Sequence, residues 1–302
     1  MISYKSKDIN SKTMLENFPI SKLNKESFPE GLLEIPDCPQ ELFIRGKLPD
    51  KSFIKLAVVG ARNYSSYCKE VCRKLILGLQ GYPVCIVSGL ALGIDAIAHE
   101  AALDARLPTV AIPGSGLDLS VIHPKQNINL AREILEKGGC LLSEMKPEDK
   151  ATIWSFPMRN RIMAGISKAT LVIEAEKKSG TLITAKLATE YNRDVLTVPG
   201  SIFSSNSEGP LLLLKLGATP IASVEDLLEA LGLENKSVAT QQKLFDDLTP
   251  DEQIIFDVLI EPLTRDEIQI KSSLPISKLN MALTLLELRG AIKEIAGKII
   301  RQ

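Results

Sequence analysis

Two arginines flank an asparagine in the stretch FPMRNRIMAG, which runs from Phe156 to Gly165. A guanidinium group suits phosphate and carboxylate oxygens because its rigid fork of N–H donors matches such anions. In an extended segment, residues two apart point to the same side, so Arg159 and Arg161 could form one outward-facing fork. The alternative is a pair of ordinary surface arginines, with at most one salt bridge between them and the rest of the protein. The fork predicts a negatively charged ligand.

A second motif, KKSGT, combines Lys177 and Lys178 with Ser179, Gly180 and Thr181. It directly precedes a helix-length segment, so a hydroxyl of the motif could simply cap that helix. Free amides, a hydroxyl and two lysines at the start of a helix also make an anion site. The residues alone leave both interpretations open.

Glycine-rich loops supply the remaining candidates. GARNYS contains Gly60 and Arg62, SGLALGID contains Ser88, Gly89 and Gly93, and GSGLD follows further along the chain. At Gly89 and Gly93, tight-turn geometry and close approach of a ligand are equal alternatives. Arg62 could be no more than a surface charge. Each loop alone is weak evidence for a ligand site, and the prediction depends on all of them following predicted strands.

Short apolar segments alternate with helix-length segments and must position these motifs. The segments that read as strands buried on both faces are Leu56–Gly60, Pro83–Ser88, Thr109–Pro113, Gly139–Ser143, Thr170–Glu174 and Asp194–Pro199. The helix-length segments are Ser66–Leu79, Asp95–Ala105, Asn127–Lys137 and Thr181–Tyr191. This alternation predicts an α/β fold with a Rossmann-like, doubly wound and mainly parallel sheet. Ligands of such sheets bind beyond the carboxyl ends of the strands, where all the candidate loops converge. The sequence therefore predicts a phosphate-binding face.

Composition narrows the function classes. The 302 residues are 45% hydrophobic and 24% charged, and the net charge is −1, so nucleic acid would have to be bound by a local basic patch. Five cysteines without a CxxC motif, and only two histidines, argue against a zinc site or a disulfide framework and fit a reducing cytosol. The polar first residues and the lack of an apolar run of about 18 residues predict a cytoplasmic protein with no membrane span.

The sequence contains no recognisable set of catalytic residues. A P-loop is absent, and GSGLDL lacks the last glycine of a dinucleotide-binding fingerprint. His99 falls within a predicted helix, and His123 has no cysteine or serine nearby in the sequence. Glu174 and Glu176 could act as an acid or a base, but no nucleophile accompanies them. These observations favour a binding protein over an enzyme, with no catalytic residue and no metal site.

Four regions follow from the composition along the chain. Residues 1–50 read as an irregular or helical lead-in, 51–233 as the Rossmann-like domain, 234–246 as a polar linker and 247–302 as a small winged-helix-like domain. In the last region Thr249 caps a first helix, Ser277 starts a third, and a hairpin turns at Ala296–Gly297. Residues 247–302 hold seven Lys/Arg and nine Asp/Glu, a net charge of −2. Protein contacts or accessory packing are therefore expected of this domain more than DNA reading.

In order along the chain, these motifs resemble the DNA-processing protein A family, also called DprA or Smf. The stretches that carry the resemblance are VVGAR, SGLALGIDAIAHEAAL, IPGSGLD, SEMKP, FPMRNRIMAGIS, VIEAEKKSGTLITAKLA, VPG and EGPLLLLKLGA, within roughly residues 31–232. The resemblance implies binding of single-stranded DNA without sequence preference, protection of incoming or recombining strands, dimerisation and delivery of the strand to RecA in natural transformation or recombination. It implies no required cofactor.

The resemblance turns the candidate loops into an expected DNA-binding set. Its members are Gly60, Arg62, Ser88, Gly89, Arg159, Asn160, Arg161, Lys177, Lys178, Ser179, Gly180 and Thr181. Two positions depart from the family pattern: Leu92 stands where the second loop usually has arginine, and Ala61 where the first usually has serine. Weaker binding than is typical of the family is one expected consequence.

Four consecutive leucines, Leu211–Leu214, cover more than one face of a helix, so packing within the domain can use only some of them. In the family this region borders the self-association surface, which implies a dimer here. The alternative is a helix fully buried against the sheet, and Pro210 puts the family geometry in doubt.

Two rival functions remain open from the sequence. The first is a small-molecule enzyme that acts on a nucleotide-derived substrate through the same phosphate-binding loops. Such an enzyme should carry an acidic residue beside a PGGxGT-like loop, whereas this chain has KSGT. The second is a structural DNA-associated scaffold with weak intrinsic binding, which would follow if Leu92 has removed most of the affinity.

Overall fold

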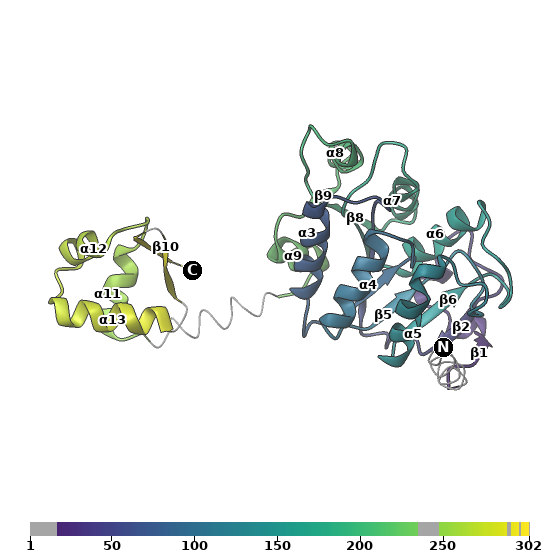
Figure 1. Cartoon of the computed structure of the whole chain (residues 1–302), viewed down its shortest axis with the longest axis horizontal. Coiled ribbons are helices and arrows are strands. Elements are labelled where there is room, and N and C mark those ends of the chain that lie inside the picture. Colours follow the sequence, from purple (N-terminus) through teal and green to yellow (C-terminus); the bar gives the residue numbers. More distant parts are fainter. Residues whose placement is uncertain (1–16, 235–247, 289–290, 296, 302) are drawn as a thin grey trace, which may run out of the picture. The chain divides into compact units, whose positions relative to one another are not determined.

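The computed structural model describes residues 17–234 and 248–301, apart from 289, 290 and 296. The chain divides into two compact units, Met1–Glu234 and Asn235–Gln302, which are treated separately below (Figure 1). Apart from Glu234, the predicted linker lies outside the described residues. No helix within the described residues is long and apolar enough to cross a membrane.

The first unit is built on a nine-stranded sheet with the order β1-β2-β6-β5-β4-β3-β7-β8-β9. Its strands are β1 (Ile20–Lys22), β2 (Phe43–Gly46), β3 (Ile54–Val59), β4 (Val84–Ser88), β5 (Thr109–Ala111), β6 (Cys140–Ser143), β7 (Ala169–Val172), β8 (Asp194–Thr197) and β9 (Thr219–Pro220). All pairs from β6 to β9 are parallel, while β1 with β2 and β2 with β6 are antiparallel. The prediction of a mainly parallel doubly wound sheet is confirmed.

Helices cover both faces of this sheet. They are α2 (Glu30–Leu33), α3 (Ser66–Leu77), α4 (Ile94–Asp104), α5 (Ile128–Glu136), α6 (Ser155–Ile166), α7 (Gly180–Glu190), α8 (Glu208–Lys215) and α9 (Val224–Leu231), with single 3-10 turns at Lys25–Ser27, Lys125–Asn127 and Ser205–Ser207. Helices α3, α4 and α5 lie side by side over one face, and α6 and α7 pack together over the other (Figure 1). All four helix-length segments expected from the sequence are helical.

Neighbouring residues of the central strands serve different cores. Val58 and Ile86 belong to the cluster under α3 and α4, whereas Val59 and Val87 belong to the cluster under α6. Side chains alternate between the faces of a strand, so a strand that is covered on both faces must be apolar throughout. This requirement is why the continuous apolar segments of the sequence identified the strands.

The lead-in segment was predicted to be irregular or helical, and the structure corrects this in part. Helix α2 is present, but β1 and β2 form an antiparallel extension of the sheet, with Phe43 to Gly46 paired with Ser143 to Cys140. Strands of three and four residues are too short to show an alternating pattern of apolar and polar side chains. The first sixteen residues lie outside the described part.

Helix α8 carries the leucine run, and none of Leu211–Leu214 is fully buried. Leu212 is 37% exposed, while Leu213 packs in part against the core under α6. The alternative of a helix buried entirely against the sheet is therefore wrong. Pro210 lies in the first turn of α8, where its missing N–H costs no helical hydrogen bond.

The second unit has three helices, α11 (Pro250–Val258), α12 (Arg265–Ser272) and α13 (Ile276–Leu288), and a hairpin of β10 (Ile292–Ile295) and β11 (Lys298–Arg301). Thr249 caps α11 in a capping box with Glu252, as predicted. An antiparallel bridge between Leu263 and Ile299 ties the hairpin to the segment before α12. This is the predicted winged-helix arrangement, although Arg289 and Ala296 lie outside the described residues.

Candidate nucleic-acid interface

A pocket of about 340 Å³ opens at the carboxyl ends of β3 and β7. From β3 the chain builds the sheet in one direction as far as β6, and then returns through α6 to place β7 on the other side of β3. This reversal is the topological switch point of a doubly wound sheet, where ligand sites form. The pocket lies where the sequence predicted a phosphate-binding face.

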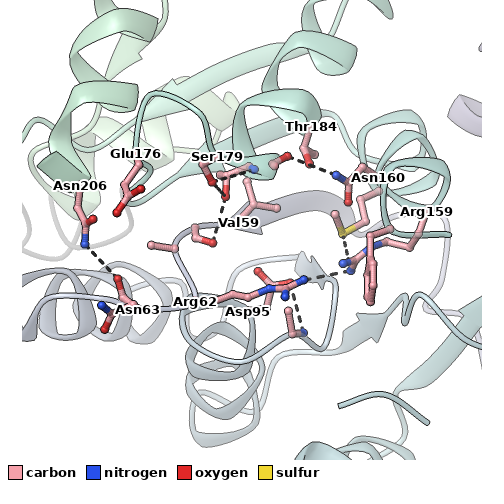
Figure 2. A pocket seen from close by; sticks show the side chains of 17 residues that line it. Val59, Arg62, Asn63, Asp95, Arg159, Asn160, Glu176, Ser179, Thr184 and Asn206 are labelled. Carbon is pink, nitrogen blue, oxygen red and sulfur yellow. Dashed lines mark hydrogen bonds and ion pairs between the residues drawn. The ribbon is translucent and has the colours of Figure 1, made fainter. Parts of the chain in front are cut away.

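Three segments line most of the pocket. The loop after β3 contributes Gly60 to Asn63, α6 contributes residues between Phe156 and Met163, and the loop after β7 with the first turns of α7 contributes residues from Glu176 to Thr184. Figure 2 shows Arg62 and Asp95 on one side, Glu176, Ser179 and Thr184 on the opposite side, and Arg159 and Asn160 at one end. Residues predicted from three separate motifs therefore meet at one site.

Arg62 is the exposed cation of the pocket. It extends into the cavity from the loop after β3, and its guanidinium carbon lies 5.3 Å from the centre of the Phe156 ring (Figure 2). Within the described residues no carboxylate forms an ion pair with it, so its N–H groups remain available to an anion. Stacking on an aromatic face restricts the side chain without using its hydrogen-bond donors.

Arg159 does not belong to an outward-facing fork, and this part of the prediction is wrong. Its side chain is 8% exposed, its Nη1 donates to the Ile112 carbonyl at 2.8 Å, and the same nitrogen lies 3.9 Å from Asp95 Oδ2. Helix α6 begins at Ser155, so the RNR stretch is helical, and side chains two residues apart on a helix point to opposite sides.

Arg161 lies on the other side of α6 and binds a carboxylate of the protein itself. Its Nη2 donates to both oxygens of Glu144, at 2.5 and 2.6 Å, and only 13% of its side chain is exposed. Both arginines of the motif therefore satisfy negative charges or carbonyls inside the domain.

The buried Asp95 organises the second glycine loop. Its Oδ2 accepts from the amides of Gly89 at 3.1 Å and Ala91 at 3.4 Å. Burial raises the pKa of this carboxyl, while the charge of Arg159 and the two amides oppose the shift. An added Cβ at Gly89 would overlap the Arg159 guanidinium, and one at Gly93, where φ is +86°, would meet the backbone of Ala61 and Arg62. Packing and turn geometry, rather than ligand approach, explain both glycines.

Ser88 and Gly89 were predicted to bind DNA, but the structure places them among buried residues outside the pocket lining. Ser88 is fully buried and donates to the Val58 carbonyl at 2.7 Å. Gly60, in contrast, lines the pocket, and a Cβ there would meet the Ile94 side chain at 2.7 Å. The loop after β3 therefore lines the pocket, whereas Ser88 and Gly89 at the start of the loop after β4 are buried outside the lining.

The KKSGT motif both caps a helix and faces the pocket, so its two interpretations hold together. Ser179 is the N-cap of α7 and accepts from the Thr181 amide at 3.2 Å, while the Thr181 hydroxyl donates to the Gly60 carbonyl at 3.1 Å. Open space surrounds the position of a Cβ at Gly180. Lys177 and Lys178 are exposed beside this helix start but are not among the lining residues. Amides at a helix N-terminus with lysines beside them suit a phosphate.

Several lining residues were not predicted. Asn206 follows β8 and donates to the Asn63 carbonyl at 3.0 Å. Asn160, which belongs to the predicted set, donates to the Gly180 carbonyl at 3.4 Å, so amide side chains join separate segments of the rim (Figure 2). Phe156 was quoted within FPMRNR without a role, although an aromatic beside arginines is a usable signal. Asn206 could have been found because it follows a sixth strand that ends at the same edge of the sheet.

Three of the four residues considered for catalysis have structural partners, whereas Glu176 is exposed and lines the pocket. Glu174 is buried and accepts from the Ser65 amide at 2.9 Å. His99 is buried with its Nδ1 2.7 Å from the Thr109 hydroxyl, and the His123 ring lies 5.8 Å from the Phe156 ring. No cluster of three or more metal-ligating side chains occurs in the part of the chain that the structure describes.

Comparison with known proteins agrees with the geometry. Residues 20–232 match the model of the family described as DNA recombination-mediator protein A, and residues 239–298 match the DprA winged helix domain. The chain belongs to the DNA recombination-mediator protein A family. The resemblance inferred from the motifs is confirmed, and the family match covers the whole pocket.

Members of this family are similar to the chain over most of its length. It is 36% identical over 294 residues to Protein Smf of Escherichia coli, covering 94% of this chain and 78% of the relative, and 38% identical to DNA processing protein DprA of Bacillus subtilis, covering 78% and 75%. The structure of DprA from Streptococcus pneumoniae aligns with a TM-score of 0.64 at 38% identity, covering 74% of this chain and 77% of that one. DNA processing protein A from Helicobacter pylori, whose structure concerns its single-stranded DNA binding mode, aligns with a TM-score of 0.63 at 29% identity, covering 71% and 96%.

Proposed function

We propose that this protein binds single-stranded DNA without sequence preference and places the backbone of the strand at the pocket between β3 and β7. The observation that carries the proposal is the meeting of Arg62 and the N-terminal end of α7, with two exposed lysines beside that end, at the switch point of a recombination-mediator fold. The single-strand binding of the Helicobacter relative supports the choice of ligand.

The chemistry of the pocket favours contacts with phosphate and with the faces of bases. A guanidinium, helix amides and hydroxyls all suit phosphate oxygens, which every nucleotide presents in the same way. Phe156 offers an aromatic face, and every base can stack on such a face. A site with these groups distinguishes a strand from a duplex through the accessibility of the bases and reads little of the sequence.

A recess of this size supports a single strand over a duplex. A volume of about 340 Å³ falls at the lower end of small-molecule pockets, which suits one nucleotide unit rather than a paired helix. In a duplex the bases are stacked and paired, so none could enter the recess without disrupting a pair.

The downstream role proposed for the bound strand is delivery to RecA in the cytoplasm, during recombination or natural transformation, with protection of the strand until then. The family description as a recombination mediator supports this role. We propose binding rather than catalysis, because Glu174 and His99 make structural contacts instead of facing a nucleophile. Assembly of RecA on a strand that already carries this protein is the matching test, and slower assembly would contradict it.

Self-association through α8 is the second element of the proposal. Leu212 and Leu216 of this region are 37% and 74% exposed, and Ile202 and Phe203 of the preceding loop are 77% and 93% exposed. Sedimentation should show a dimer that Leu212→Lys weakens. Leu33→Lys is the matched control, since Leu33 is 45% exposed on α2. A wild-type monomer at tens of micromolar, the range of weak self-association, would contradict the dimer.

Binding of labelled single strands and duplexes, with and without ATP, tests the central proposal. We expect preference for the single strand without ATP, and an affinity whose logarithm falls linearly with the logarithm of salt concentration because phosphate contacts release counterions. Equal affinity for duplex, or a strict need for nucleotide, would refute the proposal and favour the enzyme alternative.

Arg62→Glu should weaken single-strand binding by roughly a hundredfold, because it removes a charge-assisted contact and adds repulsion. Lys74→Glu makes the same charge change on an exposed lysine in the last turn of α3, at the far end of that helix from the first loop. It should bind nearly as wild type. Equal losses in both variants would mean that only net charge matters.

A further inference from the structure

Three exposed apolar side chains lie at the start of α6. Ile153 is 76% exposed, Trp154 is 73% exposed, and Met158, one turn into the helix from Trp154, is 47% exposed. Trp154 is the sole tryptophan of the chain. Isolated exposed apolar residues are common, but an indole so open to solvent, with two apolar neighbours, is typical of a binding surface.

The turn that carries Trp154 is held in place by reciprocal hydrogen bonds. The Thr152 amide donates to the Ser155 hydroxyl at 2.9 Å, and that hydroxyl donates to the Thr152 carbonyl at 2.8 Å. The Met158 amide then bonds the Trp154 carbonyl at 3.3 Å, which continues the helix. The backbone beneath the indole is therefore ordered before any ligand arrives, which lowers the entropy cost of binding.

Trp154 is also close to the pocket along the chain. Phe156, two residues later, lines the cavity and contacts Arg62 and His123 with its ring. Trp154 is the N-cap of α6, so its backbone lies at the same end of this helix as Phe156. A strand that leaves the pocket over the N-terminal turn of α6 would therefore run past Trp154.

We propose that Trp154 is a stacking platform for a base of the bound strand outside the pocket. This inference rests on the proposed function, and it adds a second binding position that Arg62, Lys177 and Lys178 do not account for. A strand is the occupant that these observations favour, because Trp154 lies two residues before Phe156, which lines the pocket, and an indole face accepts any base. An indole would then help to set how many nucleotides one protein covers.

The single tryptophan allows a direct test in the full-length protein. Binding of an oligo(dT) strand should quench the Trp154 emission, with a midpoint that equals the one measured by anisotropy of the labelled strand. Trp154→Leu keeps an apolar side chain without a ring and should weaken binding about five- to a hundredfold, whereas Trp154→Phe should keep most of the affinity. Ile270→Ala is the control, because Ile270 is 79% exposed on α12 of the winged-helix unit, and this variant should bind as wild type.

A strand of equal length that lacks bases separates stacking from phosphate contact. We expect Trp154→Leu to match wild type on this strand, because no base is present to stack. Strand binding with unchanged tryptophan emission, and equal affinities of wild type and Trp154→Leu for oligo(dT), would overturn the inference and leave the proposed function standing. Absence of any strand binding by wild type would remove both. Because Trp154 is exposed, its replacement leaves the core intact, and thermal unfolding of each variant checks this.

Discussion

The two units of this protein treat their basic residues differently. In the winged-helix unit Arg265, Lys271 and Lys278 lie 3.2, 3.1 and 3.2 Å from Glu294, Glu261 and Asp251. Arg301 lies over the Phe256 ring at 4.0 Å and bonds the Phe256 carbonyl. In the Rossmann-like unit Arg62 has no such carboxylate partner among the described residues and points into a pocket.

This difference indicates that unpaired cations are a better guide to DNA binding than the fold of a unit. A winged helix commonly reads DNA, yet here Arg265, Lys271 and Lys278 are paired with carboxylates of the same unit, and the net charge of residues 247–302 is −2. Exposed ion pairs are weak, so they stabilise the unit little, but they reduce the positive field that a phosphate would meet. We therefore expect strand affinity to come from the first unit.

The largest expected effect concerns charge buried within the first unit. Arg159→Met should lower the free energy of unfolding by about 3–5 kcal/mol, because it leaves Asp95 buried without its cation. Denaturant unfolding followed by circular dichroism measures the loss. Arg161→Met is the comparison, and it should cost less because Glu144 is 22% exposed and can reach water.

The double variant Arg159→Met with Asp95→Asn checks the cause. Removal of both charges should recover part of the stability that Arg159→Met loses, since no unpaired carboxylate then remains in the core. Additive losses would mean that Arg159 acts through its bond to the Ile112 carbonyl instead.

Acid should affect the two units unequally. Both histidines lie in the first unit, and burial lowers the pKa of His99 to about 3. The Thr109 hydroxyl donates to the Ile86 carbonyl, so it accepts from a neutral His99 that carries its proton on Nδ1. Below a pH of about 6.5 the unfolded chain takes up a proton that the folded one refuses, so stability is full above that pH and falls as pH decreases.

Between pH 8 and pH 5 this single group should cost the first unit about 2 kcal/mol. His99→Gln should remove that part of the pH dependence, whatever its effect at pH 8. The measurement is unfolding of both proteins at several pH values. Identical slopes would show that His99 takes up its proton in the folded state as readily as in the unfolded one.

A smaller effect is expected from restoring the arginine that the family pattern has at position 92. Leu92 is 42% exposed and follows Ala91, which lines the pocket. Leu92→Arg should tighten single-strand binding about fivefold and steepen the salt dependence by about 0.7, which is one phosphate contact. Leu92→Gln has similar length and no charge, so it should do neither. An unchanged salt slope in Leu92→Arg would place this loop away from the strand.

The smallest effect is expected from removal of the winged-helix unit. A chain that ends at Glu234 keeps every basic group assigned to the pocket and its own cores, so its affinity for a strand should change less than about twofold. A titration of both chains at one salt concentration decides this. A tenfold or larger loss, about 1.4 kcal/mol, would show that the winged helix contacts DNA after all.

The sequence predicted the central sheet well because its strands are buried on both faces. A short continuous apolar run such as the one in β4 is typical of a strand buried on both faces, and the segments between these runs have the length of helices. The convergence of loops at one edge then followed from topology alone. Strands β1 and β2 were not predicted, because three or four residues are too few to show a periodic pattern of apolar side chains.

The prediction of an arginine fork was wrong because the RNR stretch is helical rather than extended. The two arginines were expected in an extended segment, but α6 already begins at Ser155, and Pro157 is tolerated in its first turn because the missing N–H has no helical partner there. The partners Asp95 and Glu144 could not be identified either, since the contacts join residues 64 and 17 positions apart. Tertiary pairing of this kind has no signature in local pattern.

Both outermost strands of the sheet are short: β1 has three residues and β9 has two, one of them Pro220, which has no amide hydrogen to donate. An unpaired strand edge is what allows sheets of separate molecules to join and grow into aggregates. Within the described residues this sheet offers little such edge, so its strands are poorly suited to template fibre growth even where many copies are crowded together.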